Sequence, residues 1–150
     1  MRRSLMTVAA LLMVGVASSA LAADAKPEDL LKARQGLFQS LKMQFGPLMG
    51  AVKADAPLPA DAAARAANIV ALAQVLPTAF GPGTETLPQS HAKADAFAKK
   101  AEFLEGFKTL GDSGTKLGAA IAAGQADGIK AAVMAVGKSC KGCHDNFKEE

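Results

Sequence analysis

The stretch Cys140-Lys141-Gly142-Cys143-His144 places two thiols three residues apart and an imidazole directly after the second thiol. This spacing is typical of covalent haem attachment, in which each cysteine forms a thioether with one vinyl group of the haem. His144 would then lie beneath the iron as its proximal ligand. The motif therefore predicts one haem c, attached through Cys140 and Cys143 and ligated by His144.

Two other sites use the same cysteine spacing. A redox-active pair of cysteines is expected beside a strand and helix, and no strand pattern precedes Cys140. A structural zinc site needs two further ligands, and His91 is the only other histidine in the chain. We therefore favour the haem interpretation over a redox pair or half of a zinc site.

The residues around the motif predict an amphipathic helix. Its apolar residues and both cysteines recur at alternating steps of four and three: Ile129, Val133, Val136, Cys140, Cys143 and Phe147. Such a seam faces partner helices, so a haem held here lies with its body in the core. Gly124 is expected to end the preceding helix, and Asp127 to cap this one.

The first helix is predicted to begin at Pro27, because proline fits a first helical turn and acidic residues follow it. Apolar residues then recur at helical spacing to about Val52, with a bend expected at Gly46-Pro47. Arg34 interrupts this apolar face. Its stem could simply follow the core with its head in water, but we favour a pairing between its guanidinium and a haem propionate.

Two more helices complete the predicted fold. Asp61 is a candidate cap for a second helix that ends near Pro77, and residues 79–88 read as a loop. Ser90 is expected to cap a third helix that continues to about Ala123. Four helices with short connections favour an all-α, antiparallel four-helix bundle, and the cores of such bundles often hold cofactors.

The first 22 residues predict a secretory signal. Arg2 and Arg3 precede an apolar run from Leu5 to Val16, and Ala20-Leu21-Ala22 matches the pattern that signal peptidase cuts after. The mature protein is then expected to be a single domain, residues 23–150, in the periplasm. No later segment has the roughly 18 unbroken apolar residues of a membrane span, so no membrane association is expected after cleavage.

The charge of the chain argues against nucleic acid as a partner. The formal charge is +3, but two of the 17 basic residues and none of the 14 acidic ones lie in the predicted signal. The remaining lysines are scattered rather than clustered. A nucleic-acid-binding surface is therefore not expected.

Several segments resemble the cytochromes c′. They are Lys26–Asp29, Arg34-Gln35, the loop Phe80–Glu85, and Cys140–Asp145 followed by Phe147. The resemblance covers essentially the whole chain after residue 22. A CxxCH motif at the extreme end of a four-helix chain makes it specific.

The resemblance implies a periplasmic bundle, commonly a homodimer, whose haem iron is five-coordinate and high-spin. His144 corresponds to the proximal ligand. Phe38 matches the hydrophobic residue of the first helix that closes the distal face. Small residues on the outer faces of the first two helices, such as Ala51 and Ala63, agree with a self-complementary surface.

The resemblance also implies contacts with the edge of the haem. Arg34 and Gln35 match an arginine and a glutamine beside the haem and its propionates, and Thr84 and Glu85 in the loop are expected to contribute contacts with the haem edge. The chain departs from the family at Lys148, where relatives often have arginine four residues after the proximal histidine. An ammonium does not reproduce a planar guanidinium, so proximal chemistry is not carried over.

The sixth iron position decides between the functional hypotheses. An open position behind an apolar wall predicts binding of small gases, nitric oxide or carbon monoxide, with nitric oxide sequestration as the role that the resemblance suggests. The alternative is an electron-transfer protein with a periplasmic redox partner, either low-spin with Met49 or His91 as sixth ligand or high-spin and simply reducible. An enzyme such as a peroxidase needs a distal acid–base group, and only Arg34 is placed to serve, so no enzymatic activity is expected.

Overall fold

The computed structural model describes residues 25–149, so the predicted signal Met1–Ala22 lies outside the described residues. The described chain is helical throughout, apart from connections and one isolated β-bridge. Its elements in order are α1 (Pro27–Lys53), α2 (Ala62–Val75), the 3₁₀ helix η1 (Leu76–Ala79), α3 (Asp95–Ala98), α4 (Lys100–Ala123) and α5 (Ala126–Phe147). No helix within residues 25–149 is long and apolar enough to cross a membrane.

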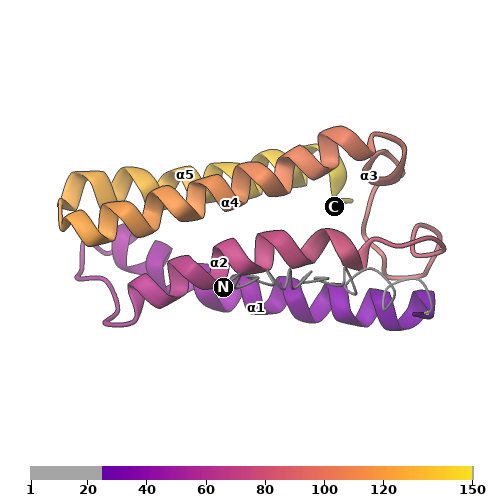
Figure 1. The fold of residues 1–150 in the computed structure, drawn as a ribbon, viewed down its shortest axis with the longest axis horizontal. Coiled ribbons are helices and arrows are strands. Elements are labelled where there is room, and N and C mark those ends of the chain that lie inside the picture. Colours follow the sequence, from indigo (N-terminus) through magenta and orange to yellow (C-terminus); the bar gives the residue numbers. More distant parts are fainter. Residues whose placement is uncertain (1–24, 150) are drawn as a thin grey trace, which may run out of the picture.

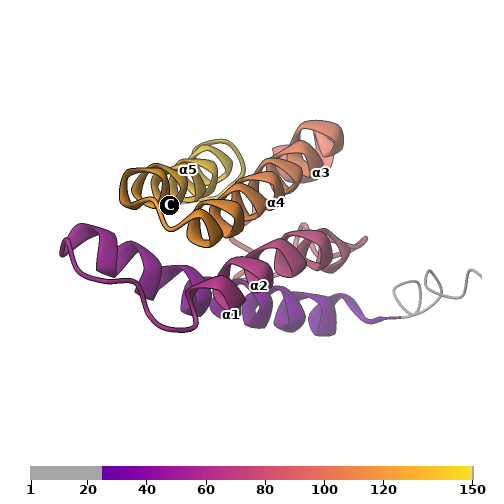
Figure 2. The same ribbon diagram turned by 60° about the vertical axis from the view of Figure 1, so that its left-hand side comes forward.

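The four long helices form two antiparallel pairs. Figure 1 shows α1 running beside α2, with α4 and α5 as the second pair, and Figure 2 shows the two pairs as separate layers. The start of α1, the short α3 and the end of α5 all lie at one end of the bundle (Figure 1). The predicted antiparallel four-helix bundle is confirmed.

The core lies between the two pairs and includes the predicted seam of α5. Val133 and Val136 on that seam are fully buried, as are Leu48 of α1, Ile69 of α2 and Leu117 of α4. At Gly114 of α4, a Cβ atom would lie 3.0 Å from a methyl carbon of Val70. The missing side chain therefore lets α2 and α4 approach closely.

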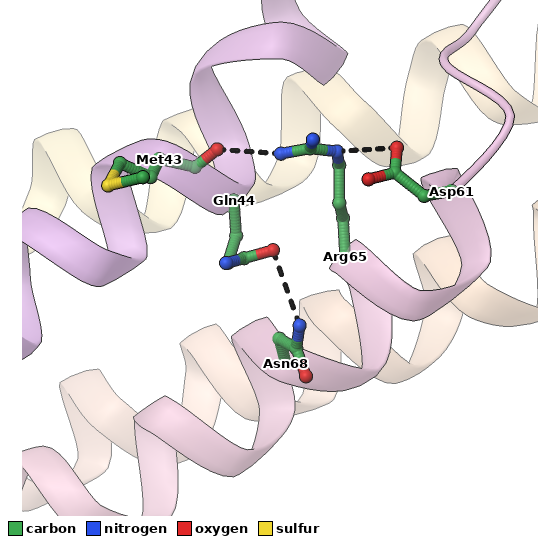
Figure 3. A network of polar contacts seen from close by, with 5 residues as sticks. All are labelled: Met43, Gln44, Asp61, Arg65 and Asn68. Atoms are coloured by element: carbon green, nitrogen blue, oxygen red, sulfur yellow. Dashed lines mark hydrogen bonds and ion pairs between the residues drawn. The ribbon is translucent and has the colours of Figure 1, made fainter.

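Helix α1 begins at Pro27 as predicted and continues through Pro47 to Lys53. Proline has no N–H, so the carbonyl of Met43, four residues earlier, loses its helical hydrogen bond. Arg65 of α2 replaces it: Nη1 donates to the Met43 carbonyl at 2.8 Å, and Nε donates to the Asp61 carboxylate at 2.8 Å (Figure 3). The bond from Arg65 is the main cause of a lowered Asp61 pKa.

Replacing Arg65 with methionine should lower the free energy of unfolding by about 0.5–1.5 kcal/mol, because the hydrogen bond to the Met43 carbonyl is lost. Urea denaturation measures this loss. In a Pro47→Ala background the same Arg65→Met change should cost less, because alanine restores the backbone N–H that proline lacks. Equal losses in the two backgrounds would show that the arginine does not compensate for the proline.

Asp61 occupies the N-cap position of α2 as predicted, but its carboxylate bonds to Arg65 and not to the helix backbone. Gly124 ends α4 in the left-handed conformation, at φ 67°, which glycine adopts without a Cβ clash. Asp61 and Gly124 therefore lie at the helix ends where the sequence predicted them.

Two predicted caps are wrong. The third helix does not start after Ser90: a short α3 is followed by a break at Lys99, and α4 begins at Lys100. The Ser90 hydroxyl instead accepts a hydrogen bond from Arg34, and the next residue has a left-handed backbone that cannot begin a helix. Helix α5 starts at Ala126 with Gln125 as N-cap, so Asp127 lies inside the first turn, where its charge favours the helix dipole.

Candidate functional site

A cavity of about 530 Å³ lies among α1, α4, α5 and the loop that precedes α3. Volumes of this size are typical of cofactor sites. Six of the predicted site residues line it: Cys140, Cys143 and His144 from α5, and Arg34, Gln35 and Phe38 from α1. The structure therefore brings together residues that are more than 100 positions apart in the sequence.

The two thiols form part of the cavity wall. Cys140 and Cys143 are half-buried and not bonded to each other. Burial raises the pKa of both thiols. Gly106 of α4 lies opposite, where an added Cβ would be 3.7 Å from the Cys143 Sγ atom, so no α4 side chain separates this thiol from the cavity.

His144 is exposed at the edge of the cavity, one residue off the α5 seam. Burial of part of the ring lowers the pKa of His144, and the charge of Lys148 lowers it further, while Asp145 opposes the shift. These effects favour the neutral imidazole, which is the form that ligates metals.

Arg34 is the buried charge of the site, with 3% of its surface exposed. Its Nε donates to the carbonyl of Ala79 at 3.2 Å, its Nη1 donates to the Ser90 hydroxyl at 3.1 Å, and its guanidinium carbon lies 4.1 Å from the ring centre of Phe80. Burial lowers the Arg34 pKa. Its Nη2 is buried without a partner in the described part of the chain, which suits an acidic group entering the cavity.

Phenylalanine rings make most of the apolar wall. Phe38 of α1 lies 6.3 Å from Phe80 and 6.4 Å from Phe107, measured between ring centres. Phe103 is 5.1 Å from Phe107 and 5.2 Å from Phe147. The sequence reasoning gave no role to Phe80 or Phe103, although Phe80 begins the loop that carries the family resemblance.

Other predicted residues lie elsewhere. Thr84 is buried, and its hydroxyl donates to the Gly81 carbonyl at 2.8 Å; neither Thr84 nor the exposed Glu85 lines the cavity. Their haem-edge contacts stay predictions. Met49 packs against Gly137 and does not line the cavity, whereas His91 does.

These residues fit a covalently bound haem. Two thiols on one helical turn face an apolar cavity of suitable size, an imidazole follows at its edge, and a buried guanidinium has an N–H group free for a carboxylate. A large flat ring with two carboxylates matches each of these features. The donor set is therefore that of a c-type haem site.

Comparison with known proteins agrees with this chemistry. The family model described as Cytochrome C' matches residues 29–148. The chain is 39% identical to cytochrome c' of Alcaligenes xylosoxydans xylosoxydans over an alignment of 129 residues, and the match covers 84% of this chain and 98% of that protein.

Solved structures of similar proteins share the fold. The crystal structure of cytochrome c' from Rubrivivax gelatinosus superposes with a TM-score of 0.74 at 37% identity, covering 83% of this chain and 98% of the other. A nitric oxide complex and a carbon monoxide complex of leucine variants of the Alcaligenes xylosoxidans protein each give a TM-score of 0.74 at 35% identity, with coverage of 84% and 98%.

Proposed function

This chain belongs to the cytochrome c′ family and carries haem c, and from that premise we propose that it is a periplasmic gas-binding protein with five-coordinate, high-spin iron. The observation that carries the proposal is the cavity beside His144, in whose wall Phe38 of α1 lies with the rings of Phe80, Phe103 and Phe107. The predicted signal Met1–Ala22 supports the periplasmic location.

The chain's own residues hold the cofactor in this proposal. Cys140 and Cys143 supply the two thioether links, and His144 supplies the proximal imidazole. Arg34 offers its free Nη2 to one propionate, forming a charge-assisted hydrogen bond in a buried place. The bound haem contributes an iron coordination position at which a diatomic gas can bind.

The phenylalanine wall determines which ligands enter. The rings of Phe38, Phe80 and Phe107 offer no hydrogen-bond donor to bound dioxygen or water, and the free N–H of Arg34 is assigned to a propionate. Nitric oxide and carbon monoxide need no such donor, and the related protein has been captured with each of them. We propose nitric oxide sequestration as the cellular role, with selectivity set by steric access.

The same wall supports a binding role and not an enzymatic one. Cleavage of peroxide needs an acid–base group that can exchange protons next to the ligand. Arg34 is the charged α1 residue buried in the cavity wall, and its guanidinium is held by Ala79 and Ser90. A side chain fixed in this way serves to bind an anion.

Two variants test the proposal against the low-spin alternative. We expect Met49→Leu and His91→Gln to leave the absorption spectra of the ferric and ferrous protein unchanged, because neither residue ligates the iron. His91 is the more stringent test, since it lines the cavity and Met49 does not. Conversion of a low-spin to a high-spin spectrum by either substitution would identify that residue as the sixth ligand.

We also propose a homodimer formed through α1 and α2. Met43 is 62% exposed and Val75 48% exposed, and both lie on this pair of helices. A hollow between α1 and α2 is lined by the apolar Leu37, Ala71, Leu72 and Val75 together with the polar Ser40, Gln44 and Asn68. Sedimentation should show a dimer at micromolar concentration, and a monomer there would refute the assembly.

A further inference from the structure

Residues Gln89–Lys93, which we name the strap, cross the end of the bundle between α1 and the end of α5. Four of them, Gln89, Ser90, His91 and Ala92, line the cavity. On the α1 side the strap is held by the bond that Arg34 Nη1 donates to the Ser90 hydroxyl at 3.1 Å. The guanidinium of Arg34 therefore holds the strap through Nη1, while its Nη2 is available to the haem.

The other side of the strap is tied to the end of α5. The backbone N–H of Lys93 donates to the carbonyl of Phe147 at 2.9 Å, and the N–H of Glu149 donates to the carbonyl of His91 at 3.0 Å. These bonds flank the antiparallel bridge between Ala92 and Lys148. The Lys93 ammonium adds a bond of 2.9 Å to the carbonyl of Asp145, the residue after His144.

The strap is held in an unfavourable backbone conformation. Gln89 has φ 66° and His91 has φ 50°, and both are ordinary residues in the left-handed region that favours glycine. Such conformations persist where surrounding contacts impose them, and they concentrate at functional sites. The hydrogen bonds at Ser90 and at residues 91–93 are the contacts that impose this one.

His144 needs support of this kind. Metal-binding histidines are usually oriented by a hydrogen bond from the second ring nitrogen. In the described part of the chain no residue forms a hydrogen bond with the His144 ring. The orientation of this imidazole therefore depends on how the last turn of α5 is held, with Phe147 packed on the core and the strap on the other side.

We propose that the strap positions the proximal ligand, with Ser90 and Lys93 as positioning residues that connect Arg34 and its haem carboxylate to His144. This inference rests on the proposed ligation of the iron by His144. It assigns the segment after the predicted loop a function beyond connecting two helices. Loosening either end of the strap should alter the iron–histidine bond.

The test uses the haem-loaded protein with Ser90→Ala and Lys93→Met, one change at each end of the strap. Hydrogen–deuterium exchange of residues 144–149 reports whether the last turn of α5 is freed, and the iron–histidine stretching band in the resonance Raman spectrum of the ferrous protein reports the ligand itself. We expect exchange to rise about two- to tenfold, the equivalent of one lost hydrogen bond. We expect the Raman band to shift and broaden.

Matched controls separate this effect from general destabilisation. Thr115→Ala removes a hydroxyl that bonds within α4, to the carbonyl of Gly111, and Lys99→Met removes an exposed ion pair with Asp95. Neither should move the band. Ser90→Thr keeps the hydroxyl and should restore the original band. The double variant Ser90→Ala with Lys93→Met should change the band little more than either single variant, because each substitution interrupts the same connection between Arg34 and His144.

Faster exchange with an unchanged Raman band would overturn the proposal, because the strap would be loosened without effect on His144. Unchanged exchange in both variants would also overturn it, because the two contacts would not hold the strap. The wild-type spectrum is recorded first. If it lacks an iron–histidine band, the proposed five-coordinate iron ligated by His144 fails, which is distinguishable from a strap that leaves an existing band unaffected.

Discussion

Replacing Phe38 with alanine should speed carbon monoxide binding to the ferrous protein by at least about tenfold, a fall of about 1.4 kcal/mol in the activation barrier. Phe38 projects from α1 into the cavity wall, where its ring meets Phe80 and Phe107. If this ring guards the iron, a ligand enters only when the ring moves, and removal of the ring removes that step. Flash photolysis of the carbon monoxide complex measures the rate.

Phe97 offers the matched control. Its ring lies 6.1 Å from that of Phe80, and it is half-buried, but it does not line the cavity. Phe97→Ala therefore removes the same group from the same aromatic cluster without opening the iron site, and the rate should stay as in the wild type. An unchanged rate in Phe38→Ala would remove Phe38 from the distal face.

The second large effect is expected at Arg34. Arg34→Met should lower the free energy of unfolding of the haem-loaded protein by about 3 kcal/mol, because two hydrogen bonds from a charged donor are lost. This loss of stability is smaller than the combined contributions of the two hydrogen bonds and the propionate pairing, because the methionine variant no longer has to bury a charge. Chemical denaturation monitored by helical circular dichroism measures it.

Arg34→Lys separates charge from geometry. Lysine keeps the positive charge, but one ammonium cannot reach the Ala79 carbonyl, the Ser90 hydroxyl and a propionate in the planar arrangement of a guanidinium. We expect it to recover only part of the lost stability. Full recovery by lysine would mean that charge alone matters, and no loss in Arg34→Met would mean that the guanidinium contributes nothing to folding.

The helical parts of the fold could be predicted from sequence because their signals are local. The apolar residues of the α5 seam alternate at steps of four and three, and three of them, Val133, Val136 and Phe147, are buried in the structure. Pro27 with two acidic residues marks the start of α1, and Gly124 marks the end of α4. The thiols and the imidazole could be assigned together because one helical turn carries all three.

The strap and its contacts could not be predicted in this way. Ser90 has the local pattern of a helix cap, but its hydroxyl accepts a hydrogen bond from Arg34, which lies 56 positions away in the sequence. The pairing of residues 91–93 with the chain end likewise joins segments that share no periodic pattern. Arg34 was predicted to meet an acidic group, but its neighbours Ala79, Phe80 and Ser90 became identifiable only from the packed structure.

The central claim is that the iron has an open but guarded sixth position. The measurement that tests it most directly is absorption and electron paramagnetic resonance of the purified haem protein in its ferric and ferrous forms, with carbon monoxide added to the ferrous form. We predict high-spin, five-coordinate iron that binds carbon monoxide. Low-spin iron that is indifferent to carbon monoxide would contradict the claim, and His91, which lines the same cavity, would then be the first candidate for the sixth ligand.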